Sequence, residues 1–301
     1  MQIAVLPEGR GAWLADAVRE GGGEVGPLEQ ADAVVWADPY DAQGLADVLA
    51  THPELPWVQL PFAGIDPFLE VLDEDRTWTC GKGVYAEPVA EMALALVLAC
   101  FRDLQQYARA ASWGSDHGRN LLGARVTVLG GGAITASLLR LLGGFDCHVT
   151  VVTRHPRPLV GAEEVVGTDR LHEVAGRSDA VVLALALTPE TERIVDADLL
   201  AALPDHAVLV NVARGRHVDT GALVAALRSG HLRAAGLDVT DPEPLPDDHP
   251  LWTLPGVLIT PHTANTKAMG RPLLATRVRE NVRRHIAGEE LLGLVDVDLG
   301  Y

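Results

Sequence analysis

The sequence predicts an α/β fold made of two domains, each a doubly wound parallel sheet. Short apolar runs typical of buried strands alternate with helical segments along most of the chain, and this alternation is typical of parallel sheets. With 301 residues, the chain is long enough to bury two cores. A polar segment at 102–123, which carries Trp113, follows a long apolar helix and marks a crossing between the two parts.

The first 91 residues contain strand candidates separated by helices. The strands are expected at residues 3–6, 33–37, 57–60 and 77–80. Helices are expected between them, at 12–20 and 42–50. After the third strand, the small-residue loop 61–66 can offer backbone N–H groups to an anion. An ordinary strand-to-helix turn explains the same loop when it is taken alone.

Six strand-like runs follow the polar segment, and they predict a doubly wound sheet of the dinucleotide-binding kind. They are expected at residues 125–129, 148–153, 180–185, 207–211, 234–238 and 257–260. The helices around them are expected at 88–102, 134–142, 197–203 and 221–229. The chain ends with a helix expected at 272–287 and an apolar stretch at 291–297.

Charge and cysteine content exclude several classes of protein. A net charge of -17 argues against non-specific binding to nucleic acid and against adhesion to anionic membranes. The three cysteines are too scattered for a disulfide framework or a metal motif, so no metal is expected. The start of the chain lacks the features of a signal peptide, and the apolar stretch 89–101 is too short for a membrane span. We therefore expect a cytoplasmic protein.

A glycine-rich turn joins the strand 125–129 to the helix that follows it. Its residues 130–135 read GGGAIT, with Gly130 and Gly132 where the backbone must approach a pyrophosphate at the start of a helix. Thr135 stands where the usual pattern has a third glycine, which allows close packing of helix on strand. Between a strand and a helix, this turn indicates a dinucleotide site. A purely structural turn is the alternative.

The end of the next strand indicates which dinucleotide is preferred. No Asp or Glu stands there to bind the ribose 2′-hydroxyl of NAD, and the chain instead reads Thr153-Arg154-His155-Pro156-Arg157. A hydroxyl and two guanidinium groups in so acidic a protein favour a 2′-phosphate, and hence NADP, with NAD still possible. A solvated basic turn is the alternative, since exposed arginines are common.

Three strand ends present polar side chains to one edge of the expected sheet. These side chains are Arg214 after the run 207–211, Asp238 and Glu243 at and after the end of 234–238, and His262 after 257–260. Ligands of open α/β sheets bind at this carboxyl edge. A histidine alone is more often structural, but an acid and an arginine at neighbouring strand ends favour a catalytic set.

This set suits reversible hydride transfer to a 2-oxo acid. His262 would protonate the carbonyl oxygen as hydride arrives from a nicotinamide. Glu243, paired with the histidine, would raise its pKa and fix its orientation. Arg214 would bind the substrate carboxylate and stabilise the charge that develops on the carbonyl oxygen.

Together these residues resemble the D-isomer-specific 2-hydroxyacid dehydrogenase family. The matching motifs, in chain order, are Ala63-Gly64-Ile65-Asp66, Val89-Ala90-Glu91, Gly130-x-Gly132-x-Ile134, Leu187-Thr188-Pro189-Glu190-Thr191, Asn211-Val212-Ala213-Arg214-Gly215, Leu237-Asp238-Val239 with Glu243-Pro244-Leu245-Pro246, and Thr260-Pro261-His262. Their order and spacing are specific to the family, although each motif alone is not, and they cover nearly the whole chain.

The resemblance implies a division into domains and an assembly. A flavodoxin-like substrate domain would comprise residues 1–91 and 266–301, with a Rossmann cofactor domain at 92–265 inserted into it. Members of the family are commonly homodimers joined through their cofactor domains, and the segment 102–123 would be the dimer arm.

The resemblance also implies the site residues. Arg214, Glu243 and His262 would be the catalytic residues, and the backbone at Ala63 and Gly64 would help Arg214 to hold the substrate carboxylate. The cofactor would be bound by Gly130, Gly132, Ala133, Ile134, Thr153, Arg154, Leu185, Val212, Ala213, Asp238 and His262.

Three departures from the family pattern bear on the function. Thr135, in place of the last glycine, bears on how tightly the cofactor binds. Ala184 and Ala186 replace the usual His and Pro before Thr188. The missing acid near Thr153 makes the chain similar to the NADP-using glyoxylate/hydroxypyruvate reductases.

The expected function is reduction of a small 2-oxo acid of the glyoxylate or hydroxypyruvate type to the D-2-hydroxy acid. A formate- or phosphite-type dehydrogenase on the same scaffold is one alternative. A non-catalytic, dinucleotide-sensing protein similar to the corepressors of this fold is another, and the intact set of Arg214, Glu243 and His262 speaks against it.

Overall fold

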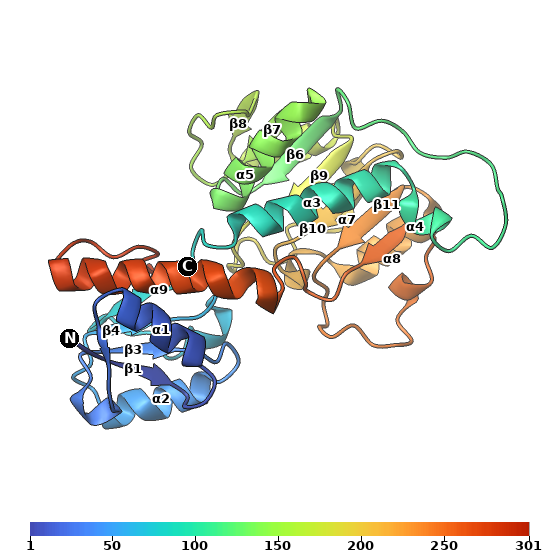
Figure 1. Cartoon of the computed structure of the whole chain (residues 1–301). Coiled ribbons are helices and arrows are strands. Elements are labelled where there is room, and N and C mark those ends of the chain that lie inside the picture. Colours follow the sequence, from blue (N-terminus) through green and yellow to red (C-terminus); the bar gives the residue numbers. More distant parts are fainter. Residues whose placement is uncertain (301) are drawn as a thin grey trace. The chain divides into compact units, whose positions relative to one another are not determined.

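The computed structural model describes residues 1–300 and divides the chain into two compact units (Figure 1). Within this range the first unit comprises residues 1–85 and 266–300, and the second comprises Ala86–Asn265. Each unit contains one sheet whose paired strands run parallel, so the predicted fold class is confirmed. The predicted boundary at residue 91 falls inside helix α3 (Ala86–Phe101), which lies in the second unit.

Five strands form the sheet of the first unit, in the order β2-β1-β3-β4-β5. They are β1 (Gln2–Leu6), β2 (Glu24–Val25), β3 (Ala33–Trp36), β4 (Trp57–Gln59) and β5 (Thr77–Thr79). Helix α1 (Ala12–Glu20) follows β1, and α2 (Ala42–Thr51) follows β3. The sequence did not predict β2, because a two-residue edge strand between glycines has no periodic pattern.

The last helix of the chain, α9 (Lys267–Ala287), also belongs to the first unit. The predicted start at residue 272 is wrong, because the Thr266 side chain caps the helix by accepting a hydrogen bond from the Met269 amide (3.4 Å). The helix therefore begins more than one turn earlier than predicted, and Pro272 lies inside it.

The carboxyl-terminal segment completes the core of the first unit. Asn281 of α9 is fully buried, and its amide donates hydrogen bonds to Gln59 Oε1 on β4 (2.9 Å) and to the Leu292 carbonyl (2.9 Å). Val295 and Val297, from the predicted apolar stretch, pack against the buried side chains of this core. A buried amide with three polar partners is costly to disrupt, so it fixes where the end of the chain returns.

Seven strands form the sheet of the second unit, in the order β12-β11-β10-β9-β6-β7-β8. They are β6 (Arg125–Leu129), β7 (His148–Val152), β8 (Glu164–Val166), β9 (Ala180–Leu183), β10 (Val208–Asn211), β11 (Ala234–Leu237) and β12 (Val257–Ile259). All six predicted strands are present. The sequence did not predict β8, because this short edge strand includes the charged Glu164 and has too few residues for a pattern.

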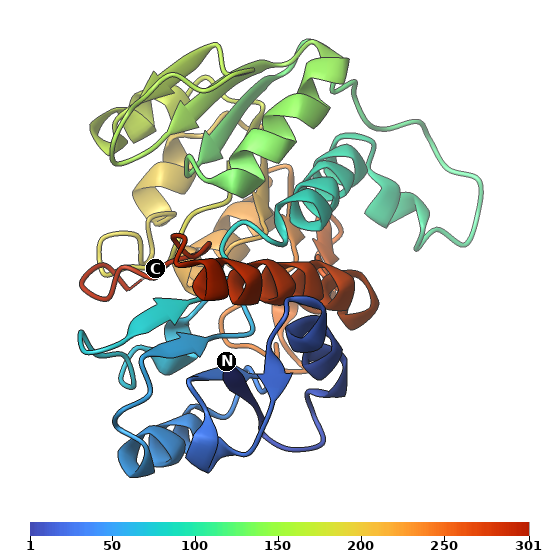
Figure 2. The ribbon, with the colours of Figure 1, turned by 60° about the vertical axis from the view of Figure 1, so that its left-hand side comes forward.

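Helices cover both faces of this sheet (Figure 2). Besides α3, the helices of this unit are α4 (Leu104–Tyr107), α5 (Ala133–Leu142), α6 (Leu171–Ala175), α7 (Ala197–Ala202) and α8 (Thr220–Ser229). Right-handed crossovers place α5 on one face, where it packs against α3, and place α7 and α8 on the other. The central strands β9 and β10 are buried along their whole length, as expected for a parallel sheet covered on both faces.

Candidate active site

Three neighbouring strands carry polar side chains at their carboxyl ends. Strands β10, β11 and β12 lie side by side in the sheet. Arg214 follows β10, Glu243 lies in the loop after β11, and His262 follows β12. The structure thus brings together at one edge the three side chains that the sequence singled out.

A short hydrogen bond within this set joins His262 to Glu243. The Nδ1 atom of His262 lies 2.6 Å from Oε1 of Glu243, and both side chains are about half exposed, at 49% and 42%. The hydrogen bond to Glu243 raises the pKa of His262, against the opposing effect of burial. The same bond lowers the pKa of Glu243. The pair therefore favours a protonated imidazole held by an ionised carboxylate.

The turn that presents His262 is held by Asp238, the residue after β11. Asp238 is 2% exposed, and its carboxylate accepts hydrogen bonds from the Thr260 hydroxyl (2.6 Å) and from the Thr263 (2.9 Å) and Ala264 (3.0 Å) amides. The His262 amide donates to the Asp238 carbonyl (2.8 Å), and His262 itself has a left-handed φ of 51°. Asp238 thus holds the histidine in a backbone conformation that its own preference disfavours.

The turn after β10 positions Arg214 in a comparable way. The buried Asn211 side chain donates to the Arg214 carbonyl (2.8 Å) and accepts from the Ala213 amide (2.9 Å). A Cβ at Gly215 would lie 1.9 Å from the Thr240 carbonyl oxygen, so only glycine lets this turn approach the loop after β11 so closely. That approach places Arg214 beside the loop that carries Glu243.

Arg214 belongs electrostatically to the same site as the histidine pair. The hydrogen bond between His262 and Glu243 and the burial of the two groups have the larger effects on their pKa values. The positive charge of Arg214 is a smaller effect, and it lowers the pKa of both groups. A fixed cation, an ionised carboxylate and a titratable imidazole therefore share one edge of the sheet. Such a set can bind an anion and exchange a proton with it.

The glycine turn after β6 has the geometry of a phosphate-binding loop. Gly130 has a φ of 105°, and a Cβ there would lie 2.3 Å from the Ala184 carbonyl oxygen, so this position requires glycine. At Gly132, the residue before α5, a Cβ would meet no atom within 4 Å, so the turn is open where the helix begins. Ala133 and Ile134 form the first turn of α5, whose amides have no partners within the helix. These residues fit a dinucleotide pyrophosphate.

Thr135 fills the position of the missing third glycine without leaving a polar group unsatisfied. It is fully buried, and its hydroxyl donates a hydrogen bond to the Gly130 carbonyl (2.7 Å). The side chain thus closes the glycine turn from inside and points away from the open face at Gly132. Thr135 is therefore a structural part of the turn.

The residues expected at the adenosine end lie on the loop after β7, beside the glycine turn. Thr153 and Arg154 follow β7, and a Cβ at Gly131 would lie 3.3 Å from the Thr153 hydroxyl. Arg154 is exposed, and its Nη2 atom lies 3.1 Å from Oε2 of Glu190 in the loop after β9. The expected lining residues follow the neighbouring strands, with Leu185 half-buried after β9, and Val212 and Ala213 buried after β10.

In the first unit, the loop after β4 leaves two backbone amides available to a ligand. The carbonyls of its residues are occupied, since Pro61 accepts from the Tyr85 hydroxyl (2.8 Å) and Phe62 accepts from the Gly81 amide (2.9 Å). Within residues 1–300, no hydrogen bond is donated by the amides of Ala63 and Gly64. Consecutive amides without a partner in the protein can donate hydrogen bonds to an anion.

A family model now places this geometry in a known context. The model for the D-isomer specific 2-hydroxyacid dehydrogenase, NAD binding domain, matches residues 93–264. The chain belongs to this family. As a member of the D-isomer specific 2-hydroxyacid dehydrogenases, the protein is an oxidoreductase that uses a nicotinamide dinucleotide.

Individual members of the family resemble the chain along most of its length. Glyoxylate/hydroxypyruvate reductase A from Serratia proteamaculans is 32% identical over 284 residues, which cover 89% of this chain and 87% of that protein. D-3-phosphoglycerate dehydrogenase from Mycobacterium leprae is 35% identical over 266 residues, which cover 85% of this chain but only 49% of that protein. The chain therefore matches about half the length of the second relative.

A solved structure of the family has the same architecture. The crystal structure of a D-isomer specific 2-hydroxyacid dehydrogenase from Xanthobacter autotrophicus Py2, in complex with NADPH and MES, matches with a TM-score of 0.86 and 33% identity. The match covers 100% of this chain and 99% of that one.

Two structural features, one in each unit, were not predicted from the sequence. His217 is fully buried and lies 3.2 Å, by its Nε2 atom, from the Ala186 carbonyl, so it ties the loop after β9 to the turn after β10. Gly81 must be glycine because a Cβ there would lie 2.9 Å from the Tyr85 ring and 3.1 Å from the Phe62 carbonyl carbon. Neither feature has a local sequence signal, because His217 and Ala186 are 31 residues apart and Gly81 meets the backbone of Phe62, 19 residues before it.

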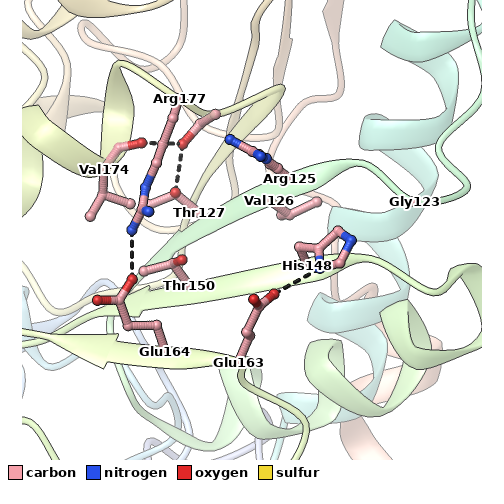
Figure 3. Close-up of a pocket in the computed structure, with 11 residues that line it drawn as sticks. Gly123, Arg125, Val126, Thr127, His148, Thr150, Glu163, Glu164, Val174 and Arg177 are labelled. Atoms are coloured by element: carbon pink, nitrogen blue, oxygen red, sulfur yellow. Dashed lines mark hydrogen bonds and ion pairs between the residues drawn. The ribbon is translucent and has the colours of Figure 1, made fainter.

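A polar cavity of about 380 Å³ lies at the other edge of the second sheet (Figure 3). Arg125 and His148, the first residues of β6 and β7, line it, together with the Thr127 and Ser178 hydroxyls, which are 2.7 Å apart. Because these strands begin at the cavity, it lies at the amino edge of the sheet. It is therefore separate from the carboxyl edge that carries His262.

Two general properties bear on ligands and membranes. Within residues 1–300, no group of three or more His, Cys, Asp or Glu side chains is placed to hold a metal ion. None of the helices described in this range combines the length and the hydrophobicity that a membrane-spanning segment requires.

Proposed function

We propose that the protein reduces a small 2-oxo acid of the glyoxylate or hydroxypyruvate type to the D-2-hydroxy acid, and that it prefers NADPH to NADH. The observation that carries the proposal is the 2.6 Å hydrogen bond between His262 and Glu243 at the sheet edge that also carries Arg214. An imidazole kept protonated by a carboxylate, beside a fixed cation, is suited to a substrate that is an anion and needs a proton.

In this proposal His262 is the general acid. A nicotinamide dinucleotide bound here would supply the hydride for the new C–H bond at the carbonyl carbon, as the C=O π bond breaks. His262 donates its proton to the carbonyl oxygen, which becomes the hydroxyl of the product. Glu243 stays ionised and stabilises the imidazolium before the transfer. In the reverse direction the neutral imidazole takes the proton back.

Arg214 has two roles in the proposal. Its guanidinium binds the substrate carboxylate, and its charge stabilises the negative charge that develops on the carbonyl oxygen. The free amides of Ala63 and Gly64 support a further role for these residues in binding the carboxylate, as the family resemblance implies. Arg214, Glu243 and His262 are thus the proposed catalytic residues.

The relatives favour this substrate class. The glyoxylate/hydroxypyruvate reductase of Serratia proteamaculans matches the chain over nearly the whole length of both proteins. The match to the phosphoglycerate dehydrogenase covers 49% of that protein. The preference for NADPH is supported by Thr153 and Arg154 after β7, where no acid stands, and by the NADPH in the related Xanthobacter structure.

The cofactor in this proposal is held by the glycine turn and the strand-end loops. The pyrophosphate would lie against Gly130, Gly132, Ala133 and Ile134, and the adenosine ribose against Thr153 and Arg154. The Asp238 carboxylate accepts three hydrogen bonds from the protein, which leaves it one further acceptor position for the cofactor. Leu185, Val212, Ala213 and His262 complete the proposed cofactor site.

Two further proposals concern the assembly and its setting. We propose a homodimer, which light scattering on the purified protein tests directly, with a monomeric mass as the contradicting result. We also propose a reducing, cytoplasmic setting, which suits three free cysteines, two of them buried.

Steady-state kinetics across a substrate panel test the proposed function. The panel contains glyoxylate, hydroxypyruvate and pyruvate with NADPH and with NADH, and formate and phosphite with NADP⁺ and with NAD⁺. We expect turnover of glyoxylate or hydroxypyruvate, with NADPH the better donor. Turnover of formate or phosphite alone would assign the protein to that type of dehydrogenase. Binding of NADPH without reduction of any 2-oxo acid would favour a dinucleotide sensor.

A further inference from the structure

An ion pair spans the glycine turn at the carboxyl edge of the second sheet. Strand β6, which leads into the turn, lies between β9 and β7. The loop after β7 carries Arg154, the loop after β9 carries Glu190, and Nη2 of Arg154 lies 3.1 Å from Oε2 of Glu190. Both side chains are solvent-accessible, at 40% and 70% exposure. The pair is therefore within reach of a ligand that binds at the turn.

Glu190 is held in place from its own loop as well. The Thr188 hydroxyl donates a 2.8 Å hydrogen bond to the same Oε2 atom that Arg154 contacts. The Thr188 amide in turn donates to the Thr191 hydroxyl (2.8 Å), which donates to the Ala186 carbonyl (2.8 Å). These bonds fix the loop, so the carboxylate is presented to Arg154 by a braced segment.

The two members of the pair suit the two forms of the adenosine ribose. A guanidinium recognises the 2′-phosphate of NADP(H), and a carboxylate accepts a hydrogen bond from the 2′-hydroxyl of NAD(H). Dinucleotide-binding sheets commonly provide that carboxylate at the end of the second strand, where this chain has Thr153 and Arg154. Here the carboxylate comes instead from the neighbouring loop and is already bonded to the arginine.

We propose that Glu190 sets the discrimination between NADP(H) and NAD(H) by competing with the 2′-phosphate for Arg154 and by offering an acceptor to the 2′-hydroxyl. This proposal rests on the proposed dinucleotide site and its NADPH preference. The 2′-phosphate must displace a carboxylate that already occupies the guanidinium, and it must approach a like charge. NAD(H) meets no such competition. Glu190 therefore reduces the preference for NADP(H) over NAD(H) that Arg154 creates.

The test measures binding, without a substrate, to the full-length protein. NADPH and NADH are titrated by nucleotide fluorescence, and 2′,5′-ADP and 5′-AMP by calorimetry. The test variant is Glu190→Gln, which keeps an oxygen for Thr188 and removes the charge. The matched control is Glu192→Gln, which removes a carboxylate of the same loop that pairs with Arg216 (2.8 Å) instead.

We expect Glu190→Gln to tighten NADPH and 2′,5′-ADP by about fivefold, the upper range for an exposed ion pair. It should leave NADH and 5′-AMP unchanged or slightly weaker, and Glu192→Gln should change none of the four. In the background of Arg154→Gln, the gain for 2′,5′-ADP should fall by at least half, because the competition is for Arg154.

An equal change for phosphorylated and unphosphorylated ligands, or none, would overturn the role of Glu190. A full gain in the Arg154→Gln background would also overturn it, because Glu190 would then act without the arginine. A failure of the proposed function would give a different set of results. Failure of every 2-oxo acid to react leaves these affinities measurable, whereas failure of all four nucleotides to bind would overturn both proposals.

Discussion

Nδ1 of His262 lies 2.6 Å from Oε1 of Glu243, and the two side chains reach each other from the ends of adjacent strands. His262 follows β12 directly, whereas Glu243 lies in the loop after β11. The bond raises the pKa of the imidazole and lowers the pKa of the carboxyl. Between those two pKa values both groups are charged, and the pair is at its strongest.

The first prediction concerns the pH dependence of the reaction. Reduction needs protonated His262, so its rate should fall as the pH rises through the raised pKa of this group. Glu243→Gln removes the charge that stabilises the imidazolium, so the alkaline limb of the kcat profile should move to lower pH. The exposed Asp247→Asn, in the same loop, is the control and should leave the profile in place. An unchanged profile in Glu243→Gln would contradict the pairing.

The same pKa directions fix the sign of the pair's small contribution to folding. The stability that His262 contributes is fully present below the ordinary histidine pKa, and it is lost as the pH rises through the raised pKa. The stability that Glu243 contributes is fully present above the ordinary carboxyl pKa, and it is lost as the pH falls through the lowered pKa. Both side chains are half exposed, so solvent screening keeps the effect small.

The second prediction concerns Arg214. Arg214→Lys keeps a positive charge but loses the planar fork that binds a carboxylate through two bonds. We expect kcat/KM to fall by about tenfold to a hundredfold, with kcat lowered as well as KM raised, because the charge also acts on the developing oxyanion. NADPH affinity, measured by fluorescence, should be retained. A change in KM alone would limit Arg214 to substrate binding.

The third prediction concerns Thr135. Thr135→Val keeps the buried volume but removes the hydroxyl that donates a hydrogen bond to the Gly130 carbonyl. The free energy of unfolding should therefore fall by about 1–3 kcal/mol. Thr135→Ser keeps the hydroxyl and should lose less. Both are measured by urea denaturation. Equal stability of wild type and Thr135→Val would show that the bond contributes nothing.

The fourth prediction concerns the close approach at Gly215. The added methyl of Gly215→Ala would collide with the Thr240 carbonyl, so the turn must move away from the loop that carries Glu243. We expect a loss of about 1–3 kcal/mol in unfolding free energy and a large loss of kcat. Gly114→Ala is the control, because a Cβ there meets no atom within 4 Å. Normal stability and activity of Gly215→Ala would contradict the close packing of these turns.

The sequence predicted the strands of both sheets because buried parallel strands leave short apolar runs. It also singled out Arg214 and His262, since a single polar residue just after such a run lies at the carboxyl edge. Elements without a periodic pattern were missed, as β2 and β8 illustrate. The start of α9 was predicted wrongly because proline is common at the first helical position, whereas here Thr266 caps the helix earlier.

Contacts between distant segments were beyond the reach of the sequence. Thr135 was expected to affect the cofactor, but its partner, the Gly130 carbonyl, is known only once the turn is folded. Asp238 was expected to bind the cofactor, and the structure adds that its carboxylate holds the turn of His262. The pairing of Glu190 with Arg154 joins loops 36 residues apart, and no local pattern reports it.

The most direct measurement of the central claim is the rate of NADPH oxidation with glyoxylate and hydroxypyruvate, compared between wild type and His262→Asn. We predict turnover by the wild type and a fall in kcat of about a hundredfold or more in the variant, as expected for loss of a general acid. NADPH affinity, to which His262 also contributes in the proposed cofactor site, should change far less than kcat. Equal turnover by His262→Asn, or no reduction of either acid by the wild type, would contradict the account.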